Sequence, residues 1–293
     1  MKIRFWGVRG SIPTPGPDTV RYGGNTSCIE VRTEGGALII LDAGTGIHPL
    51  ARQLLWEMPI SAGIFITHTH WDHIQGLPFF LPLFVQANHI SIHGPFDPIT
   101  SQGIDQVMNV QMQYSFFPVR EAELCARIDY HSLSPGQMVE FGDARVTPVL
   151  LNHPVINYGY RIDSGGKSLF FTGDHEPHTN IYKPGEDNFD SFQSLIDEKE
   201  ASIEAMLSGV DVLIADCAYT ESEYAVKKGW GHGNFASALA LAQRIGAKTL
   251  FCTHHEPGRD DDALEAAFAA ALSAAPQKGC DMQLAREGLE YTW

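Results

Sequence analysis

The stretch FITHTHWDHIQGLP, residues 65–78, carries His68, His70, Asp72 and His73 within six positions, directly after an apolar run. A single histidine after a strand is usually a surface or hydrogen-bonded residue. Three imidazoles and a carboxylate so close together instead match the ligand types that Zn²⁺ takes from proteins. The stretch therefore predicts a metal site, and its completion depends on partners elsewhere in the chain.

The spacing within this stretch suggests two metals rather than one. If residues 66–70 stay extended, His68 and His70 project to the same side, because strand side chains alternate, and they can share a metal. Asp72 and His73 lie beyond, where the chain must turn, and can hold a second metal. Two metals about 3.5–4 Å apart require a bridging carboxylate and further imidazoles.

The missing partners follow other apolar runs in the chain. Their length and β-branched content predict buried strands at residues 37–41, 63–67, 146–151, 168–172, 211–215 and 249–253. The first acidic or histidine residues after these runs are Asp42, His68, His153, Asp174, Asp216 and His254. Groups at the same ends of neighbouring strands can meet at one edge of a sheet, so we expect His153, Asp174 and His254 to complete the site. With imidazole and carboxylate ligands and no thiolate, Zn²⁺ is the first expectation, with Mn²⁺ or Fe as alternatives.

Composition narrows the kind of substrate. The net charge of −15 disfavours the broad basic face that a long nucleic acid requires, and favours a small anionic substrate bound at a local pair of cations. No apolar stretch reaches the roughly 18 residues of a membrane span, so no membrane association is expected. The five scattered cysteines and the absence of an apolar signal-like start predict a cytoplasmic protein.

The remaining pattern predicts one domain over residues 1–293 with two insertions. Helices are expected over residues 47–58, 234–247 and 261–275. A helical insertion is expected near 104–124, broken at Pro118. Residues 176–200 are polar and acidic, which predicts a surface insertion.

Taken together, these motifs resemble those of the metallo-β-lactamase superfamily. THTHWDH is similar to its H-x-H-x-D-H motif, LNHP, FTGDHE and CTHHEP to its later His, Asp and His motifs, and LDAGTG to its first Asp motif. The resemblance implies an α/β fold of four layers (α+β), an αββα sandwich with the metals at one edge.

The resemblance also implies a ligand set. One metal would take His68, His70 and His153, the other Asp72, His73 and His254, with Asp174 bridging both. His255 stands next to His254 and is an alternative to it. Asp42 would support the metal-binding loops, or else form a turn within DAGTG.

Two further features narrow the branch of the superfamily. The bridging position is Asp174 and not a cysteine, unlike the antibiotic-cleaving members with a thiolate ligand. The start WGVRGSIPTPGPDTVRYGGNTSCIEV and the motif GWGHGNF resemble ribonuclease Z-like phosphodiesterases. This implies that His232 assists chemistry at phosphorus and that Asp216 orients it. A loop histidine and a turn aspartate are the plainer readings of these two residues.

The function expected from all this is metal-dependent hydrolysis of a small phosphodiester, first of all a cyclic nucleotide. Two metals would lower the pKa of a water that attacks phosphorus, and Asp72 would orient this water or accept its proton. His232 would bind a phosphate oxygen or protonate the leaving oxygen. Lactone or thioester hydrolysis on the same metals and RNA processing are the alternatives, although no basic arm for RNA is evident.

Weaker expectations concern the surroundings of the site. Asn25 and Ser27 are candidates for supporting it, and by default are turn residues. Tyr114, Phe116, Phe117 and Trp230 are candidates for stacking on a nucleobase. The resemblance also admits a homodimer, with 104–124 as a candidate interface.

Overall fold

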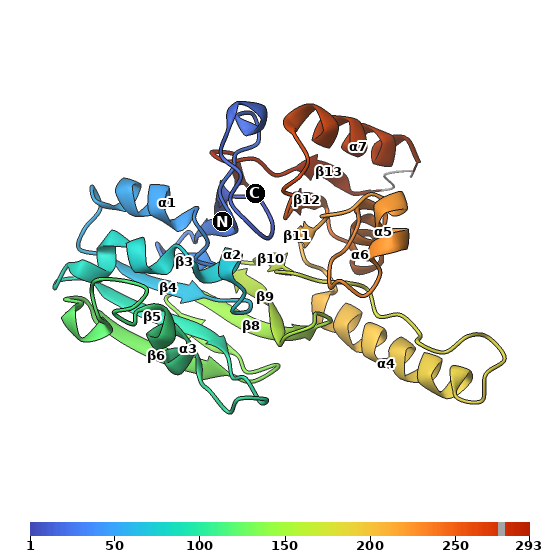
Figure 1. Cartoon of the computed structure of the whole chain (residues 1–293), viewed down its shortest axis with the longest axis horizontal. Coiled ribbons are helices and arrows are strands. Elements are labelled where there is room, and N and C mark those ends of the chain that lie inside the picture. The colour runs from blue at the N-terminus through green and yellow to red at the C-terminus, as the bar shows by residue number, and fades with distance from the viewer. Residues whose placement is uncertain (275–278) are drawn as a thin grey trace.

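Two mixed β-sheets lie face to face in the middle of the molecule (Figure 1). The computed structural model describes residues 1–274 and 279–293. Within these residues one seven-stranded sheet has the order β14-β1-β2-β3-β4-β5-β6 and the other the order β13-β12-β11-β10-β9-β8-β7. The first sheet comprises β1 (Lys2–Gly7), β2 (Cys28–Arg32), β3 (Leu38–Leu41), β4 (Ser61–Phe65), β5 (His89–Pro95), β6 (Arg127–Leu133) and β14 (Glu290–Thr292). The second comprises β7 (Val139–Phe141), β8 (Ala144–Leu151), β9 (Asn157–Ser164), β10 (Lys167–Phe171), β11 (Val212–Asp216), β12 (Thr249–Thr253) and β13 (Asp281–Leu284).

Helices cover the outer faces of both sheets. The α-helices are α1 (Ile47–Leu54), α2 (Trp71–Ile74), α3 (Ile104–Gln111), α4 (Phe189–Leu207), α5 (Glu221–Lys227), α6 (Phe235–Ile245) and α7 (Asp261–Ala274). Short 3₁₀ turns occur at Pro17–Thr19, Leu77–Phe79, Leu81–Phe84 and Glu121–Glu123. Apolar residues of α1 and α3 form a core with the first sheet, and those of α4, α6 and α7 form a core with the second.

The strands alternate between these cores, as their buried sequences require. In β3, Ile39 and Leu41 lie in the core between the two sheets, whereas Leu38 and Ile40 face the helices. In β12, Phe251 faces the other sheet while Leu250 and Cys252 face the helices. Strands buried on both faces read as continuous apolar runs. The four layers confirm the predicted αββα sandwich.

All six predicted strands are present, with ends shifted by up to two residues. The helix predicted over 234–247 is α6, where the Asn234 side chain accepts the Ser237 N–H at 2.8 Å and Gly246 ends the helix at φ 76°. The helix predicted over 47–58 is shorter and ends at Leu54. Residues 261–274 are helical as predicted, and Ala275 lies outside the described residues.

The helical insertion predicted near 104–124 is wrong in its length. Helix α3 ends at Gln111, and the chain then turns, with the backbone N–H groups of Phe116 and Phe117 both donating to Gln113 O. Pro118 has no N–H to donate and disfavours helical backbone at Phe117. The predicted break at Pro118 is therefore wrong as well, because the helix already ends seven residues before the proline.

The surface insertion predicted over 176–200 needs two corrections. Its second half belongs to α4, a helix anchored by buried Ile196, Ile203 and Leu207. In Figure 1 this helix and the loop before it project from the body of the molecule. Its first residue, Glu176, is only 3% exposed, so it is an interior carboxylate and not part of a solvated loop.

The topology brings the predicted site residues to one edge. Strands β3 and β4 run parallel, as do β10, β11 and β12, so their carboxyl ends lie on the same side of their sheets. The two sheets are joined at this edge by Tyr160 of β9, whose hydroxyl donates to Ile66 O at 2.6 Å. Tyr158 N–H also donates to Thr67 O at 2.9 Å. These bonds fix the segment that leads into His68.

Among the described residues, no helix has both the length and the apolar character that crossing a membrane requires.

Replacing Tyr160 with Phe tests this joint. The ring is fully buried, and its loss of a hydroxyl leaves a buried carbonyl without its donor. We expect the free energy of unfolding, measured in urea, to fall by about 1–3 kcal/mol. Tyr114→Phe removes the same atom from a ring that is 76% exposed and serves as the control. Equal stability of the two variants would contradict the role assigned to Tyr160.

Candidate metal centre

One group of side chains gathers three imidazoles around Asp174. His68, His70, His153 and Asp174 each offer a ligand atom, and these atoms lie within 4.8 Å of one another. His153 Nε2 lies 3.2 Å from His70 Nδ1, and Asp174 Oδ2 lies 3.6 Å from His68 Nε2 and 3.8 Å from His153 Nε2. Strand β4 ends at Phe65, two residues before the predicted end, but the backbone of His70 is still extended, with φ −63° and ψ 151°. The side chains of His68 and His70 both belong to this group, as predicted.

A second group shares Asp174 with the first. Asp72, His73, Asp174 and His254 offer ligand atoms within 4.8 Å of one another. Asp174 Oδ1 lies 3.1 Å from both His73 Nε2 and His254 Nε2, while Asp72 Oδ2 lies 3.3 Å and 3.2 Å from the same two nitrogens. The structure thus brings together all seven residues predicted as ligands, with Asp174 between the two groups.

The atoms of both groups fit divalent cations. A tetrahedron with metal–ligand bonds of about 2.0–2.1 Å has edges of about 3.3 Å, and the separations above are close to this value. His68 Nε2, His73 Nε2 and Asp174 Oδ1 are buried and have no hydrogen-bond partner. Buried polar atoms are nearly always paired. The unpaired nitrogen and oxygen atoms at the centre of the two groups therefore fit a role as ligands of cations.

The electrostatics of the two groups point the same way. Burial lowers the pKa of His68, His70 and His153, which keeps these imidazoles in the neutral, metal-binding form. Burial also opposes protonation of His73 and His254, but the neighbouring carboxylates, Asp174 first among them, outweigh it and raise both pKa values, that of His254 to about 9. The second group therefore holds an excess of negative charge that a cation would balance.

Asp42 supports this arrangement from behind. Its Oδ2 lies 2.6 Å from His73 Nδ1, which leaves Nε2 of His73 to face the centre. The same carboxylate accepts the Thr67 N–H at 2.8 Å and the Ser27 hydroxyl at 3.2 Å. Ser27 therefore touches the support of a candidate ligand, as expected, whereas Asn25 donates to Glu287 and braces the N-terminal loop.

Local backbone strain marks the same region. Of the four non-glycine residues with positive φ among those described, Ser11, Asp42 and His254 lie at this centre, with φ of 61°, 61° and 58°. Such conformations cost free energy and persist where the surroundings impose them. The Ser11 N–H donates to Asp72 Oδ2 at 2.7 Å, so the N-terminal loop also helps to fix a candidate ligand.

His254, and not His255, faces the centre. His255 is fully buried, its Nε2 lies 2.8 Å from Ala285 O, and burial lowers its pKa to about 3. It belongs to neither group of candidate ligands. The geometry thus favours the first of the two adjacent histidines.

A third group places the predicted pair of His232 and Asp216 beside the centre. His232 Nδ1 lies 2.9 Å from Asp216 Oδ2, and its ring stacks on that of His254 with centroids 4.8 Å apart. Burial opposes protonation of His232, yet Asp216 and Asp174 outweigh it and raise its pKa. Because Nδ1 is engaged, Nε2 is the atom available to a substrate.

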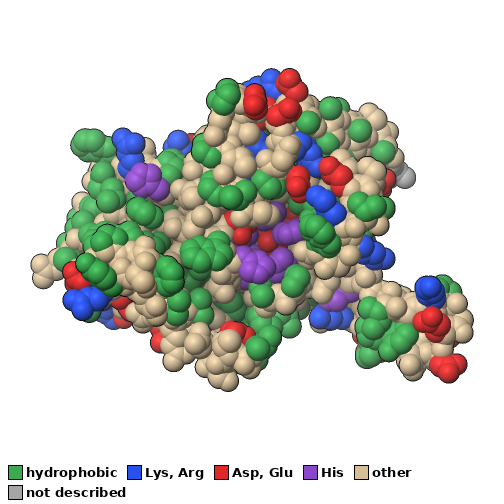
Figure 2. Space-filling model, viewed as in Figure 1, with side chains coloured by type: hydrophobic (Ala, Val, Ile, Leu, Met, Phe, Trp, Pro, Cys, Tyr) green, Lys and Arg blue, Asp and Glu red, His purple; other side chains and the backbone are tan. Residues whose placement is uncertain are grey.

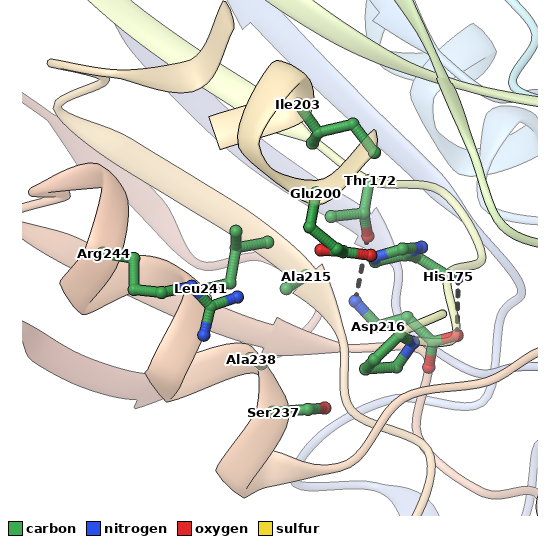
Figure 3. Close-up of a pocket in the computed structure, with 11 residues that line it drawn as sticks. Thr172, His175, Glu200, Ile203, Ala215, Asp216, Ser237, Ala238, Leu241 and Arg244 are labelled. Atoms are coloured by element: carbon green, nitrogen blue, oxygen red, sulfur yellow. Dashed lines mark hydrogen bonds between the residues drawn. The ribbon is translucent and has the colours of Figure 1, made fainter. Parts of the chain in front are cut away.

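Asp216 is itself held by the backbone around it. Figure 3 shows the Asp216 carboxylate beside His175, whose backbone N–H donates to Oδ2 at 3.2 Å. The backbone N–H of Asp216 donates to Thr172 Oγ1 at 3.1 Å. Oδ1 accepts the Ala218 N–H at 3.0 Å. A carboxylate fixed by this many bonds can fix the tautomer of His232 in turn.

A cavity of about 250 Å³ opens from this centre to the surface, lined by Ser11, His70, Trp71, Asp72, Asp174 and His232. Figure 2 shows it as a hollow where histidine and acidic side chains gather, with hydrophobic side chains at its rim. Ser11 and Trp71, which is 67% exposed, were missed by the sequence reasoning. Their positions next to predicted ligands are the signal that could have found them.

The aromatic residues predicted to stack on a base have no such lining position. Tyr114 and Phe116 are 76% and 65% exposed, and Phe117 packs edge-on against Phe79 with centroids 5.3 Å apart. Trp230 is 62% exposed and stands two residues before His232. A stacking role stays a prediction for these residues, and the position of Trp71 makes it a further candidate.

Comparisons with known proteins agree with this geometry. A family model described as a beta-lactamase superfamily domain matches residues 38–255. Ribonuclease BN of Erwinia tasmaniensis is 27% identical over 293 residues, covering 87% of this chain and 88% of that protein.

Two solved structures share the fold over nearly the whole chain. The metallo-beta-lactamase fold protein YhfI from Bacillus subtilis has a TM-score of 0.67 and 19% identity, covering 99% of this chain and 98% of that one. A diphosphatase from the PhnP family has a TM-score of 0.65 and 18% identity, covering 100% and 97%. The matched residues 38–255 span more than half of the chain and include both histidine groups. The chain therefore belongs to the metallo-β-lactamase superfamily, as a metal-dependent hydrolase.

Proposed function

We propose that the protein hydrolyses small phosphodiesters, cyclic nucleotides first among them, at a centre that holds two divalent cations. The observation that carries this is Asp174, shared between two groups of imidazoles, with His232 beside them. Zn²⁺ suits the donor atoms best, and Mn²⁺ or Fe would also fit them. Cations at this place would lower the pKa of a water and neutralise phosphate oxygens.

The seven candidate ligands divide as the two groups do. His68, His70 and His153 would hold one cation, Asp72, His73 and His254 the other, and Asp174 both. Asp72 also lines the cavity, with Oδ2 fixed by the Ser11 N–H, so this carboxylate can accept a proton from an attacking water.

His232 has the geometry of a proton donor to the leaving oxygen. Asp216 Oδ2 lies 2.9 Å from Nδ1 of His232, and this carboxylate raises the pKa of the ring against the effect of burial. The protonated imidazole, which would donate its proton from Nε2, is therefore stabilised. Proton transfer of this kind contributes about 10²–10⁴-fold to rate. A phosphodiester has an alkoxide leaving group that benefits from such a donor.

The surroundings of the cavity favour a small substrate. None of its lining residues is a lysine or arginine. The projecting helix α4 has five acidic residues and one lysine, so it offers no cationic surface to a phosphate backbone. An exposed tryptophan, Trp71, lines the cavity and gives a nucleobase a face to stack on.

An RNA-processing nuclease is the second candidate function, and the similarity to ribonuclease BN favours it. The two candidates differ in what must reach the cavity, a free small diester or a strand held outside it. Lactone and thioester hydrolysis would use the same ligands but would not call on His232 in the same way.

A panel of substrates separates these functions. Purified protein loaded with Zn²⁺ or Mn²⁺ would be assayed on cyclic mononucleotides, cyclic dinucleotides, an aryl phosphodiester, a lactone, a thioester and a structured RNA. We expect cyclic nucleotides and the aryl diester to be hydrolysed, with kcat/KM highest for a cyclic nucleotide. Salt-dependent binding and cleavage of the RNA, without turnover of cyclic nucleotides, would favour the nuclease instead.

Replacing His232 with Ala tests the proton donor. We expect kcat on a cyclic nucleotide to fall by about 10²-fold or more while the bound metal stays the same, because His232 is not among the seven ligands. Metal content would be measured by mass spectrometry on the same preparation. His89→Ala, at a histidine paired with Asp129 on another strand pair, is the control. Unchanged turnover in the His232 variant would remove it from the chemistry.

Replacing His70 with Ala should produce a different pattern. His70 lies at the mouth of the first group, so its loss takes a ligand from one cation and leaves the second group intact. We expect metal content to fall from about two equivalents to about one, together with loss of most activity. Two retained equivalents with normal turnover would show that His70 holds no metal.

A further inference from the structure

Three consecutive residues, Asp174 to Glu176, each address a different part of the site. Asp174 lies between the two groups of imidazoles. The N–H of His175 donates to Asp216, the partner of His232, as Figure 3 shows. Glu176 accepts hydrogen bonds from the loop of residues 229–231, which leads into His232. The role of Glu176 is the one that the proposed mechanism leaves open.

Glu176 is a buried carboxylate that grips this loop with both oxygens. Its Oε1 accepts the Gly229 N–H at 2.7 Å and the Tyr224 hydroxyl at 3.0 Å, and its Oε2 accepts the Gly231 N–H at 2.8 Å. Among the described residues no Lys, Arg or His forms an ion pair with it. A carboxylate that is 3% exposed is costly unless hydrogen-bonded, and here neutral donors supply all the compensation.

The loop that Glu176 grips also orients a candidate metal ligand. The carbonyl of Gly231 accepts a hydrogen bond from His153 Nδ1 at 2.9 Å, which leaves His153 Nε2 to face Asp174 and His70. Gly231 has φ 90°, and a Cβ there would lie 2.4 Å from Pro154 Cδ and 2.5 Å from His153 Nδ1. The peptide of Gly231 is thus packed directly against His153 and has little room to move.

The backbone of Glu176 is also hydrogen-bonded to the residue next to His153. Its N–H donates to Asn152 O at 3.0 Å, and Asn152 Nδ2 donates back to Glu176 O at 3.0 Å. Asn152 is the residue before His153. The chain around His153 is therefore held to Glu176 twice, once through Asn152 and once through Gly231.

From these hydrogen bonds we infer that Glu176 is a positioning residue for both His153 and His232. By fixing loop 229–231, Glu176 fixes the position of the Gly231 carbonyl, which in turn fixes the tautomer and orientation of His153. It also fixes the backbone that leads directly into His232. Residues that orient metal ligands in this way affect metal affinity or activity by about 10–100-fold. The inference rests on the proposed function only for the part that concerns His232.

The alternative is that Glu176 only stabilises the fold, and an isosteric substitution distinguishes the two. Glu176→Gln keeps the size of the side chain but replaces one acceptor oxygen with an NH₂ group, which cannot accept the glycine N–H that it would face. Glu200→Gln is the matched control. Figure 3 shows Glu200 close to His175. The carboxylate of Glu200 pairs with His178 and not with loop 229–231.

The test measures Co²⁺ binding by visible absorption and kcat on an aryl phosphodiester for the wild type and both variants. For Glu176→Gln we expect one of two Co²⁺ equivalents to bind about 10–100-fold more weakly, and kcat to fall by about tenfold or more with KM little changed. For Glu200→Gln we expect both to match the wild type. Wild-type Co²⁺ binding and kcat in folded Glu176→Gln would overturn the inference.

Hydrogen exchange on the wild type decides the matter if Glu176→Gln does not fold. The inference requires the Gly229 and Gly231 amides to exchange slowly, because a buried carboxylate accepts both. Exchange at the rate of an open loop would overturn it. The two proposals also fail separately: a wild type that binds two Co²⁺ ions but hydrolyses no diester contradicts the proposed function and leaves the Co²⁺ comparison intact.

Discussion

Negative charge buried at one edge of the two sheets is the constraint on which the rest of this structure depends. Asp72, Asp174 and Asp216 are each less than 5% exposed, and the imidazoles around them include nitrogens without a hydrogen-bond partner. Burying a carboxylate costs free energy unless opposite charge or hydrogen bonds compensate for it. Two cations at Asp174 would supply that compensation. The same bound ions would therefore define the geometry of the site and stabilise this edge of the fold.

The candidate ligands follow the ends of strands whose positions are fixed by the core. Apolar residues of both sheets interlock between them, while the loops at the carboxyl ends carry the polar groups. Hydrogen bonds behind the ligands then select one nitrogen of each imidazole: Asp42 holds His73, and the Gly231 carbonyl holds His153. In these loops, hydrogen bonds rather than apolar packing fix the orientation of the side chains.

Much of the fold and of the site could be predicted from the sequence because strong local signals coincide with them. Buried strands are continuous apolar runs, and each ends at a residue whose chemistry differs sharply from the run before it. His68, His153 and Asp174 were found in this way. The helix predicted beyond Gln111 was wrong because an apolar, aromatic segment has the same composition whether it continues a helix or turns.

Other features depend on contacts that no local pattern encodes. Glu176 stands at the start of a polar, acidic stretch, and only the folded chain shows that loop 229–231 buries it. The choice of His254 over His255 depends on which ring the Ala285 carbonyl takes. Ser11 reaches Asp72 across 61 residues of sequence. In each case a distant backbone group decides the role of a side chain.

Whether Asp174 joins two cations is measured most directly by a crystal structure of the metal-loaded protein, with anomalous diffraction at the absorption edge of the metal. We expect two anomalous peaks about 3.5–4 Å apart. Asp174 would contact both, with His68, His70 and His153 around one and Asp72, His73 and His254 around the other. No peak at Asp174, a single ion there, or ions held by other residues would contradict it.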